Sequence, residues 1–336
     1  LCNLNVVDIG YKMPCYTPMK AYYDADGNVK LGDSEESKLL YLPCGRCIGC
    51  RNDLTKDWAV RCYHESQLHD HNCVLTLTFD EDHINNTGTL VKEDVVNFIK
   101  RLRAYISRSE LLKTKHRHLY RKRISYLYCG EYGHKFKRPH YHIILFGFDF
   151  PDKKFLKDSE SGDQLFSSEI LQKLWPFGFS TIGQMSMASA MYCASYITKY
   201  VSNKEKSLYY TDQQTGEYKQ PEFGNASKKP ALGLNWLKTY VNDISAHNSV
   251  IIADQKYRIP RYYLKKMEEL FPNKYEKLKI KREEKLDNQS PDWIDLKNKQ
   301  TIALANLHNS GTLKSPDNKK RLAYLQEKAS QYRSKK

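Results

Sequence analysis

The sequence predicts an α+β protein with a central antiparallel β-sheet and flanking helices, preceded by a cysteine-rich segment and followed by a helical extension. Two segments, 124–133 and 140–148, are rich in β-branched and aromatic residues and are separated by a short basic turn, which is typical of a hairpin. Around it the strand and helix patterns follow the order βα-β-β-αβα. This spacing favours antiparallel pairing, with the helices on one face of the sheet.

The segments before the hairpin alternate between irregular, helical and extended patterns. Residues 1–43 are turn-rich and irregular, with a loop at 24–37. A helix is expected over 52–70, then a strand at 73–79 and a helix over 92–108 with apolar residues at helical spacing. The apolar side of the first helix would hold Trp58, Val60, Tyr63 and Leu68.

After the hairpin we expect a short helix at 167–176, a strand at 177–185 and a helix over 186–204. Beyond them lie a Gly/Pro loop with a short helix at 223–240 and another helix at 259–272. We therefore expect four parts, which are listed in chain order: a cysteine-rich segment and helix (1–68), a catalytic domain (69–204), its C-terminal extension (205–273) and a charged tail, partly disordered or helical (274–336).

The charge balance favours a polyanionic partner. The chain has 54 Lys and Arg against 39 Asp and Glu, a formal net charge of +15. Nucleic acid or an anionic membrane surface would suit that excess. No apolar stretch approaches the roughly 20 residues of a membrane span, so we expect no membrane partner. The absence of a phosphate-binding GxxxxGK[ST] motif argues against a nucleotide-driven helicase.

Two histidines one residue apart in "KRPHYHIILFG" form the first candidate site. Residues i and i+2 of a strand share a face, so His140 and His142 aim at one point. A hairpin turn near 134–138 would bring Glu131 alongside. Two imidazoles and a carboxylate suit a divalent cation such as Mg²⁺ or Mn²⁺ with open positions. The alternative is a pair of structural histidines beside a basic turn.

The helix "YCASYITK" forms the second candidate site. Tyr192, Tyr196 and Lys199 fall at i, i+4 and i+7 and so share one face. Taken alone, such a stripe is more often a core-packing face with a surface lysine. Beside a cation that polarises a phosphate, however, a phenol becomes a useful nucleophile. Attack on DNA would leave a phosphotyrosyl ester and a free hydroxyl, and a second tyrosine would permit a second exchange.

These two motifs, in this order, resemble the HUH endonucleases that initiate rolling-circle replication. More closely, the chain is similar to the replication initiators of the microvirus family of single-stranded DNA phages, gokushovirus branch. The resemblance extends over most of the chain and is carried by "PCGRCIGCR", "LTLTFDEDH", "FIKRLR", "CGEYG", "RPHYHIILFG", "LWPFGF", "YCASYITK", "SKKPALGLNW" and "IPRYY".

The resemblance implies an HUH/RRM-like sheet that carries the histidines, and an enzyme that nicks one strand of replicative-form DNA at the origin. The protein would stay on the 5′ phosphate while a host polymerase extends the 3′-OH, with a host helicase unwinding, in the cytoplasm of the bacterial host. Tyr192, Tyr196 and Lys199 would be the catalytic set. Ser195 and Tyr200 depart from the family pattern, and Tyr200 is a reserve nucleophile.

The run Cys44, Cys47 and Cys50 is a third candidate site, because two-residue spacing suits thiolate chelation of zinc. Cys15 is the nearest fourth ligand, with Cys2, Cys62 and His64 as alternatives. Unliganded thiols are the competing interpretation. An iron–sulfur pattern is disfavoured because Leu54 stands where a fourth cysteine would fall. The other core candidates, read as small buried hydrophobes, are Cys62, Cys73, Cys129 and Cys193.

Clustered Lys and Arg side chains interleaved with aromatic residues predict a surface for single-stranded origin DNA and supercoiled replicative-form DNA. The expected contacts are Lys100, Arg101, Arg103, Arg121, Lys122, Arg123, Lys137 and Arg138. Two alternative functions remain at this point. One is a noncatalytic, zinc-stabilised nucleic-acid-binding protein. The other is a plasmid relaxase, which the position of the tyrosines after the histidines disfavours.

Overall fold

The computed structural model describes Cys15 and residues 18–24, 26, 28–33, 39–84, 88–133, 136–159, 161–198, 210–211 and 216–287. The chain forms two compact units. The larger holds Thr55–Val241 and Ile259–Tyr263, and the smaller holds Leu1–Leu54, Asn242–Arg258 and Leu264–Lys336. In the described part of the chain, no helix is long and apolar enough to cross a membrane.

A seven-stranded antiparallel sheet forms the larger unit, with strand order β10-β5-β6-β4-β9-β8-β7. The α+β class and the antiparallel central hairpin are confirmed. In chain order the strands are β4 (Asn72–Thr78), β5 (Ser125–Tyr132), β6 (Pro139–Phe146), β7 (Lys154–Asp158), β8 (Gln164–Ser167), β9 (Ser180–Gly183) and β10 (Phe223–Ala226). The β7–β8 hairpin lies in a stretch to which the sequence assigned no element.

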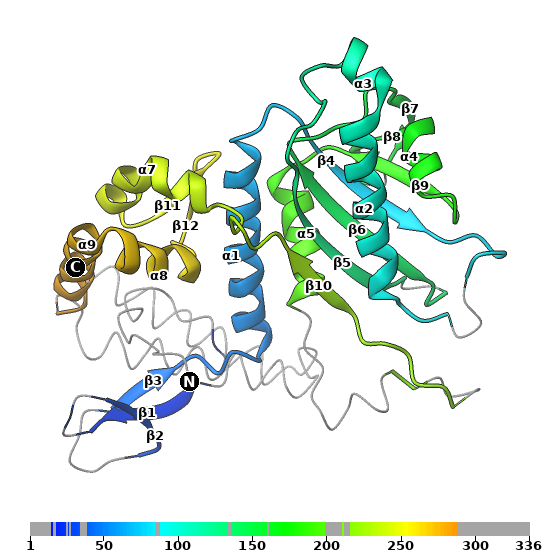
Figure 1. The fold of residues 1–336 in the computed structure, drawn as a ribbon. Coiled ribbons are helices and arrows are strands. Elements are labelled where there is room, and N and C mark those ends of the chain that lie inside the picture. Colours follow the sequence, from blue (N-terminus) through cyan, green and yellow to red (C-terminus); the bar gives the residue numbers. More distant parts are fainter. Residues whose placement is uncertain are drawn as a thin grey trace. The chain divides into compact units, whose positions relative to one another are not determined.

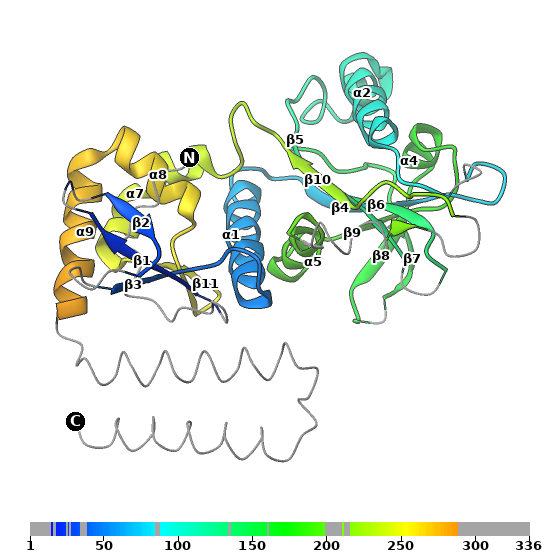
Figure 2. The same ribbon diagram turned by 90° about the horizontal axis from the view of Figure 1, so that it is seen from below.

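Helices cover both faces of this sheet, so the expectation of helices on one face is wrong (Figures 1 and 2). One face packs against the helices α2 (Lys92–Arg108), α3 (Glu110–Lys115) and α4 (Glu169–Leu174), and the other against α5 (Met187–Ile197) and the part of α1 (Ile48–Ser66) from Thr55 onward. The reason lies in β6. Tyr141, Ile143 and Leu145 enter the first core, while Ile144 and Phe146 enter the second, and a strand buried on both sides needs two covers.

The edge strand β10 corrects a second expectation, since this stretch was predicted to be a Gly/Pro loop. It pairs with β5, with Gly224 opposite Cys129. A Cβ on Gly224 would lie 2.2 Å from Cγ1 of Ile197, so the glycine is needed where α5 packs closely on this strand.

The helix α1 is less simply amphipathic than its pattern suggested. Of the expected apolar residues, Val60 is buried, Trp58 and Tyr63 are half-buried, and Leu68 lies exposed beyond the helix end. Its buried stripe includes Arg61, whose Nε donates to the Leu232 carbonyl at 3.1 Å. Other buried polar residues of this stripe are Asp57, His64 and Glu65.

The smaller unit contains short strands and helices that the sequence partly missed. A sheet of order β2-β1-β3, built from Met19–Tyr23, Val29–Leu31 and Leu39–Leu42, replaces the irregular segment expected within 1–43. Its core holds Ala21 and Leu42 with Val29, too few residues to give a periodic signal. Near the C-terminal end are α7 (Leu234–His247), β11 (Val250–Ile252), β12 (Gln255–Tyr257), α8 (Arg261–Leu270) and α9 (Pro272–Asp287); α7 and α8 cross the unit boundary.

The core beneath α2 generates a stability prediction. Phe98 is fully buried in it, whereas Val96 on the same helix is 39% exposed. We expect Phe98→Ala to lower the free energy of unfolding by about 3–5 kcal/mol because it leaves a cavity. The matched change Val96→Ala should alter it by less than about 0.5 kcal/mol. Chemical denaturation monitored by circular dichroism measures both, and equal effects would contradict the placement of α2.

Candidate active site and candidate metal centre

The predicted histidines lie in the middle of the sheet, on the face that α5 covers. Strand pairing places Glu131 opposite His140 on one side and Thr78 opposite it on the other. In the next row of the same face, His142 lies between Cys129 and Thr76. The hairpin β5–β6 therefore brings Glu131 alongside the histidines, as its nine-residue spacing predicted.

Glu131 and His142 are in direct contact and are both buried. The Nε2 atom of His142 lies 2.7 Å from Oε1 of Glu131, and its Nδ1 atom lies 3.1 Å from the Thr76 hydroxyl. Because a hydroxyl can donate or accept, Thr76 suits either neutral tautomer of the imidazole. A buried carboxylate is thereby hydrogen-bonded across two strands.

Both tyrosines of α5 close over this pair. The Tyr192 hydroxyl donates to Oε1 of Glu131 at 3.2 Å. The Tyr192 ring meets the His142 ring edge-on at 5.2 Å between centroids, and the Tyr196 ring stacks on it at 6.1 Å. The i, i+4 spacing thus places both phenols beside the histidine strand, with 5.1 Å between their ring centroids.

The electrostatics of the cluster follow from burial and shared hydrogen bonds. Burial alone would raise the pKa of Glu131, but hydrogen bonds from His142, Tyr196 and Tyr192 outweigh it and lower the pKa. Burial raises the pKa of Tyr192 to about 12, with the Glu131 charge adding to the effect. Burial, then a hydrogen bond to Glu131, also raises the pKa of Tyr196. The carboxylate is charged at neutral pH, and the phenols hold their protons.

His140 is only partly buried and opens toward solvent. Its Nδ1 lies 2.7 Å from the Arg138 carbonyl, which can only accept, so the proton sits on Nδ1 and Nε2 offers a lone pair. A backbone partner of this kind commonly orients a metal-bound histidine.

The donor types of His140, His142 and Glu131 fit a divalent cation. As arranged here, however, Glu131 bonds to His142 and Tyr192, and the three residues do not form a group with mutually close donor atoms. Within the described residues, the four cysteines form such a group.

The remaining predicted site residues are distributed as follows. Lys199 and the reserve nucleophile Tyr200 lie outside the described residues. Lys137 and Arg138 lie next to the histidines, and Arg138 donates to the Glu81 carboxylate and, at 2.9 Å, to the Phe79 carbonyl.

The other predicted DNA contacts lie away from the histidines. Lys100, Arg101 and Arg103 are on α2, which covers the opposite face, and Arg101 donates to the Leu174 carbonyl at 2.9 Å. The run at 121–123 precedes β5, about 26 Å along that strand from Glu131 at 3.3 Å per residue. A contact made by these residues would therefore be distant from the tyrosines.

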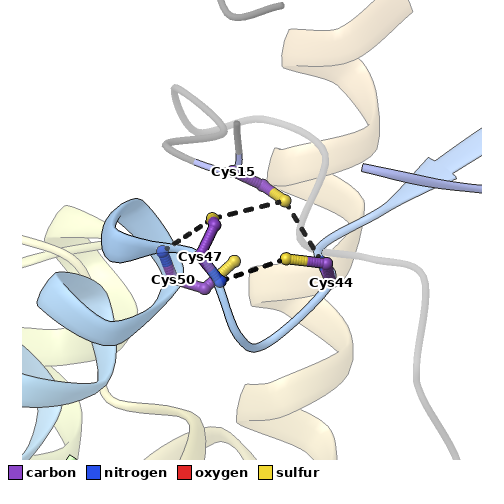
Figure 3. Close-up of side chains that lie close together, drawn as sticks. All are labelled: Cys15, Cys44, Cys47 and Cys50. Carbon is purple, nitrogen blue, oxygen red and sulfur yellow. Dashed lines mark hydrogen bonds between the residues drawn. The ribbon is translucent and has the colours of Figure 1, made fainter. Parts of the chain in front are cut away.

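Four cysteines converge in the smaller unit (Figure 3). The Sγ atoms of Cys15, Cys44, Cys47 and Cys50 all lie within 4.8 Å of one another. Cys15 is buried, and its Sγ accepts the backbone N–H of Cys44 at 3.2 Å. A hydrogen bond with Cys15, followed by burial, raises the pKa of the Cys50 thiol. Such a cluster is able to hold a metal such as zinc, which would stabilise the thiolates.

The structure selects Cys15 as the fourth member of this group. Cys2 lies outside the described residues, and Cys62 and His64 are buried among other side chains of α1. Cys62, Cys73, Cys129 and Cys193 are buried, as predicted, and none of the described cysteines is in a disulfide.

Sequence reasoning missed Thr76, the second partner of His142. The signal was available, because Thr76 and Thr78 are the polar members of one face of an otherwise apolar strand. It missed Phe179 as well, which lines a pocket with His140 although it lies 39 positions later in the chain. No local pattern reports that proximity.

Comparison with known proteins gives consistent matches. The family model for the replication-associated protein ORF2 matches residues 72–205. The chain is 34% identical to replication-associated protein VP4 of Bdellovibrio phage phiMH2K, over 84% of this chain and 88% of that protein. It is 33% identical to replication-associated protein ORF2 of Spiroplasma virus 4, over 78% of this chain and 77% of that protein. No solved structure matches significantly.

The cysteine cluster generates a metal-binding prediction. We expect the purified chain to carry one Zn²⁺, and Cys47→Ser or Cys50→Ser to lose it, as measured by elemental analysis. Cobalt substitution should produce thiolate charge-transfer absorption. Because binding requires thiolates, uptake should release protons and weaken as the pH falls. The control Cys73→Ala changes a buried cysteine of the large sheet and should retain the metal. Full metal content in the Cys47 and Cys50 variants would contradict the centre.

Proposed function

The chain belongs to the replication-associated proteins of the microviruses, and from that premise we propose that it is the nicking–joining enzyme of rolling-circle replication. Its antiparallel sheet with paired histidines fits an HUH endonuclease. In this proposal the enzyme cuts one strand of replicative-form DNA at the origin and later rejoins the displaced strand. The single observation that carries the proposal is the contact of Tyr192 with Glu131, which itself bonds to His142.

The chemistry is a transesterification. The Tyr192 or Tyr196 hydroxyl oxygen attacks the phosphorus of the scissile phosphodiester, and the bond from phosphorus to the 3′ oxygen breaks. The products are a 5′-phosphotyrosyl ester and a free 3′-OH, which takes up a proton and primes synthesis. The ester conserves the energy of the broken bond, so rejoining needs no nucleotide cofactor.

Deprotonation of the phenol is the demanding step, since the pKa of Tyr192 is about 12 in its bond to Glu131. We assign His140 through Nε2, His142 through Nε2 and Glu131 as the ligands of Mg²⁺ or Mn²⁺. The cation would supply Lewis-acid polarisation of the phosphate. Ligation turns Glu131 away from Tyr192, whose hydroxyl is then able to face the phosphate. Lys199 would neutralise charge on the phosphate.

The close pair of phenols supports two sequential exchanges. With the ring centroids of Tyr192 and Tyr196 5.1 Å apart, the second hydroxyl is near the ester formed by the first. It can cut the regenerated origin while the first is still occupied, which releases one unit-length strand. We place this reaction in the cytoplasm of the bacterial host, with a host helicase and polymerase as partners and structural zinc at the four cysteines.

The decisive experiment is covalent capture. Labelled single-stranded origin DNA with Mg²⁺ or Mn²⁺ should form an SDS-resistant adduct that peptide mapping assigns to Tyr192 or Tyr196. Each single Tyr→Phe change should reduce nicking or joining, and the double change should abolish the adduct. Tyr126→Phe, on the opposite face of the sheet, is the control and should leave it unchanged. If the wild-type chain forms no adduct with any metal, a noncatalytic DNA-binding role is favoured.

The metal assignment has its own test. His140→Ala should reduce metal-dependent cleavage by at least about 100-fold, because loss of a ligand should exceed the 10–100-fold cost of losing a ligand's partner. Oligonucleotide binding should change only a few-fold. His116→Ala, in the loop after α3, should have no effect on cleavage. Full activity of the His140 variant at saturating Mn²⁺ would remove His140 from the ligand set.

A further inference from the structure

A pocket of about 350 Å³ opens beside His140. Strand β4 and the residues after it form one wall, and the start of β6 and the segment before β9 form the others. Its lining residues are Thr78, Phe79, Asp80, Glu81, Arg138, Pro139, His140 and Phe179. One candidate ligand of the active-site metal therefore also faces this pocket, so whatever enters it lies next to the reacting phosphate of the proposed function.

The rim of the pocket carries an exposed aromatic side chain on a rigid backbone. Phe179 is 76% exposed, yet its carbonyl accepts both the N–H and the hydroxyl of Thr78, at 2.9 and 3.0 Å. The preceding Gly178 packs so closely that a Cβ there would lie 2.4 Å from the Asp80 nitrogen. A large apolar ring held in water on fixed backbone is suited to stack a flat partner.

The polar groups of the pocket are two carboxylates and one guanidinium. Asp80 is oriented by His83, which contacts Oδ1 through its backbone N–H at 3.0 Å and through Nδ1 at 2.7 Å. Glu81 pairs with Arg138 but remains largely exposed. Two carboxylates against one guanidinium repel a phosphate, so the backbone of the DNA does not belong here. They accept hydrogen bonds from the edge of a base.

We propose that this pocket receives the unstacked base adjoining the scissile phosphate and selects a base with an exocyclic amino group. The base stacks on Phe179, donates its amino hydrogens to Asp80 or Glu81, and accepts from Arg138. Thymine fits poorly, because its single ring N–H is flanked by two carbonyl oxygens that the carboxylates repel. This inference rests on the proposed function for the position of the phosphate, and it adds a specificity determinant to that site.

The test measures binding without cleavage, using fluorescent dC15, dA15 and dT15 and no added divalent metal. The wild-type chain should bind dC15 and dA15 at least about fivefold more tightly than dT15, the lower end of what one well-placed base contact contributes. Glu81→Ala should reduce that discrimination to within about twofold. Phe179→Ala should weaken binding of all three by about tenfold, as expected for loss of one stacked base.

Phe155→Ala is the matched control, because Phe155 is 58% exposed on β7 and does not line the pocket. It should leave all three affinities unchanged. Equal affinities of the wild-type chain for the three oligonucleotides, or equal effects of the Phe179 and Phe155 changes, would overturn the inference while covalent capture still supported the enzyme. A Phe179-dependent base preference without any adduct would uphold the pocket and reject the nicking activity.

Discussion

The contact between Glu131 and His142 is the interaction on which the candidate active site depends. A carboxylate in this buried position is costly unless it is hydrogen-bonded. It takes hydrogen bonds from a histidine of the neighbouring strand and from the tyrosines of a helix. These bonds align β5, β6 and α5 at one point, so the same requirement that stabilises the buried charge also gathers the chemical groups. The arrangement is compact because Glu131 has several partners and few oxygen atoms.

A strand buried on both sides divides the labour of the sheet. The face toward α2 is nearly all apolar and supplies packing energy. The face toward α5 is apolar at Ile144 and Phe146, and becomes polar at His142 and His140 as β6 approaches the turn. Because side chains alternate along a strand, polar groups enter one face without disturbing the core on the other. The functional groups thus sit at one end of a firmly packed frame.

The chain separates two kinds of metal chemistry. Four thiolates favour a soft or borderline cation in a closed tetrahedral site, which leaves no position for a substrate. Two imidazoles and a carboxylate favour a harder divalent cation with open positions. The cysteines lie in the smaller unit and the histidines in the larger. The different donors allow each site to select its own ion, so a structural metal does not displace a catalytic one.

Local periodicity determined much of this protein from the sequence alone. The one-residue spacing of His140 and His142, the four-residue spacing of Tyr192 and Tyr196, and the Cys-x2-Cys-x2-Cys run each predicted side chains that share a face or a centre. In the structure the tyrosines and His142 are in contact, and the cysteines converge. Helix α2 has the predicted bounds, since its apolar residues repeat at the helical period over several turns.

Tertiary structure alone decided which distant segments meet. Cys15 joins Cys44 across 29 positions, and β10 pairs with β5 although its sequence resembles a loop. Cover on both sheet faces, the separation of the 121–123 run from the histidines, and the position of Phe179 beside His140 likewise followed from strand register and packing. A short-range pattern specifies the direction of each side chain from its own backbone. The neighbour that it meets depends on how the whole chain folds back, which involves many weak contacts far apart in sequence.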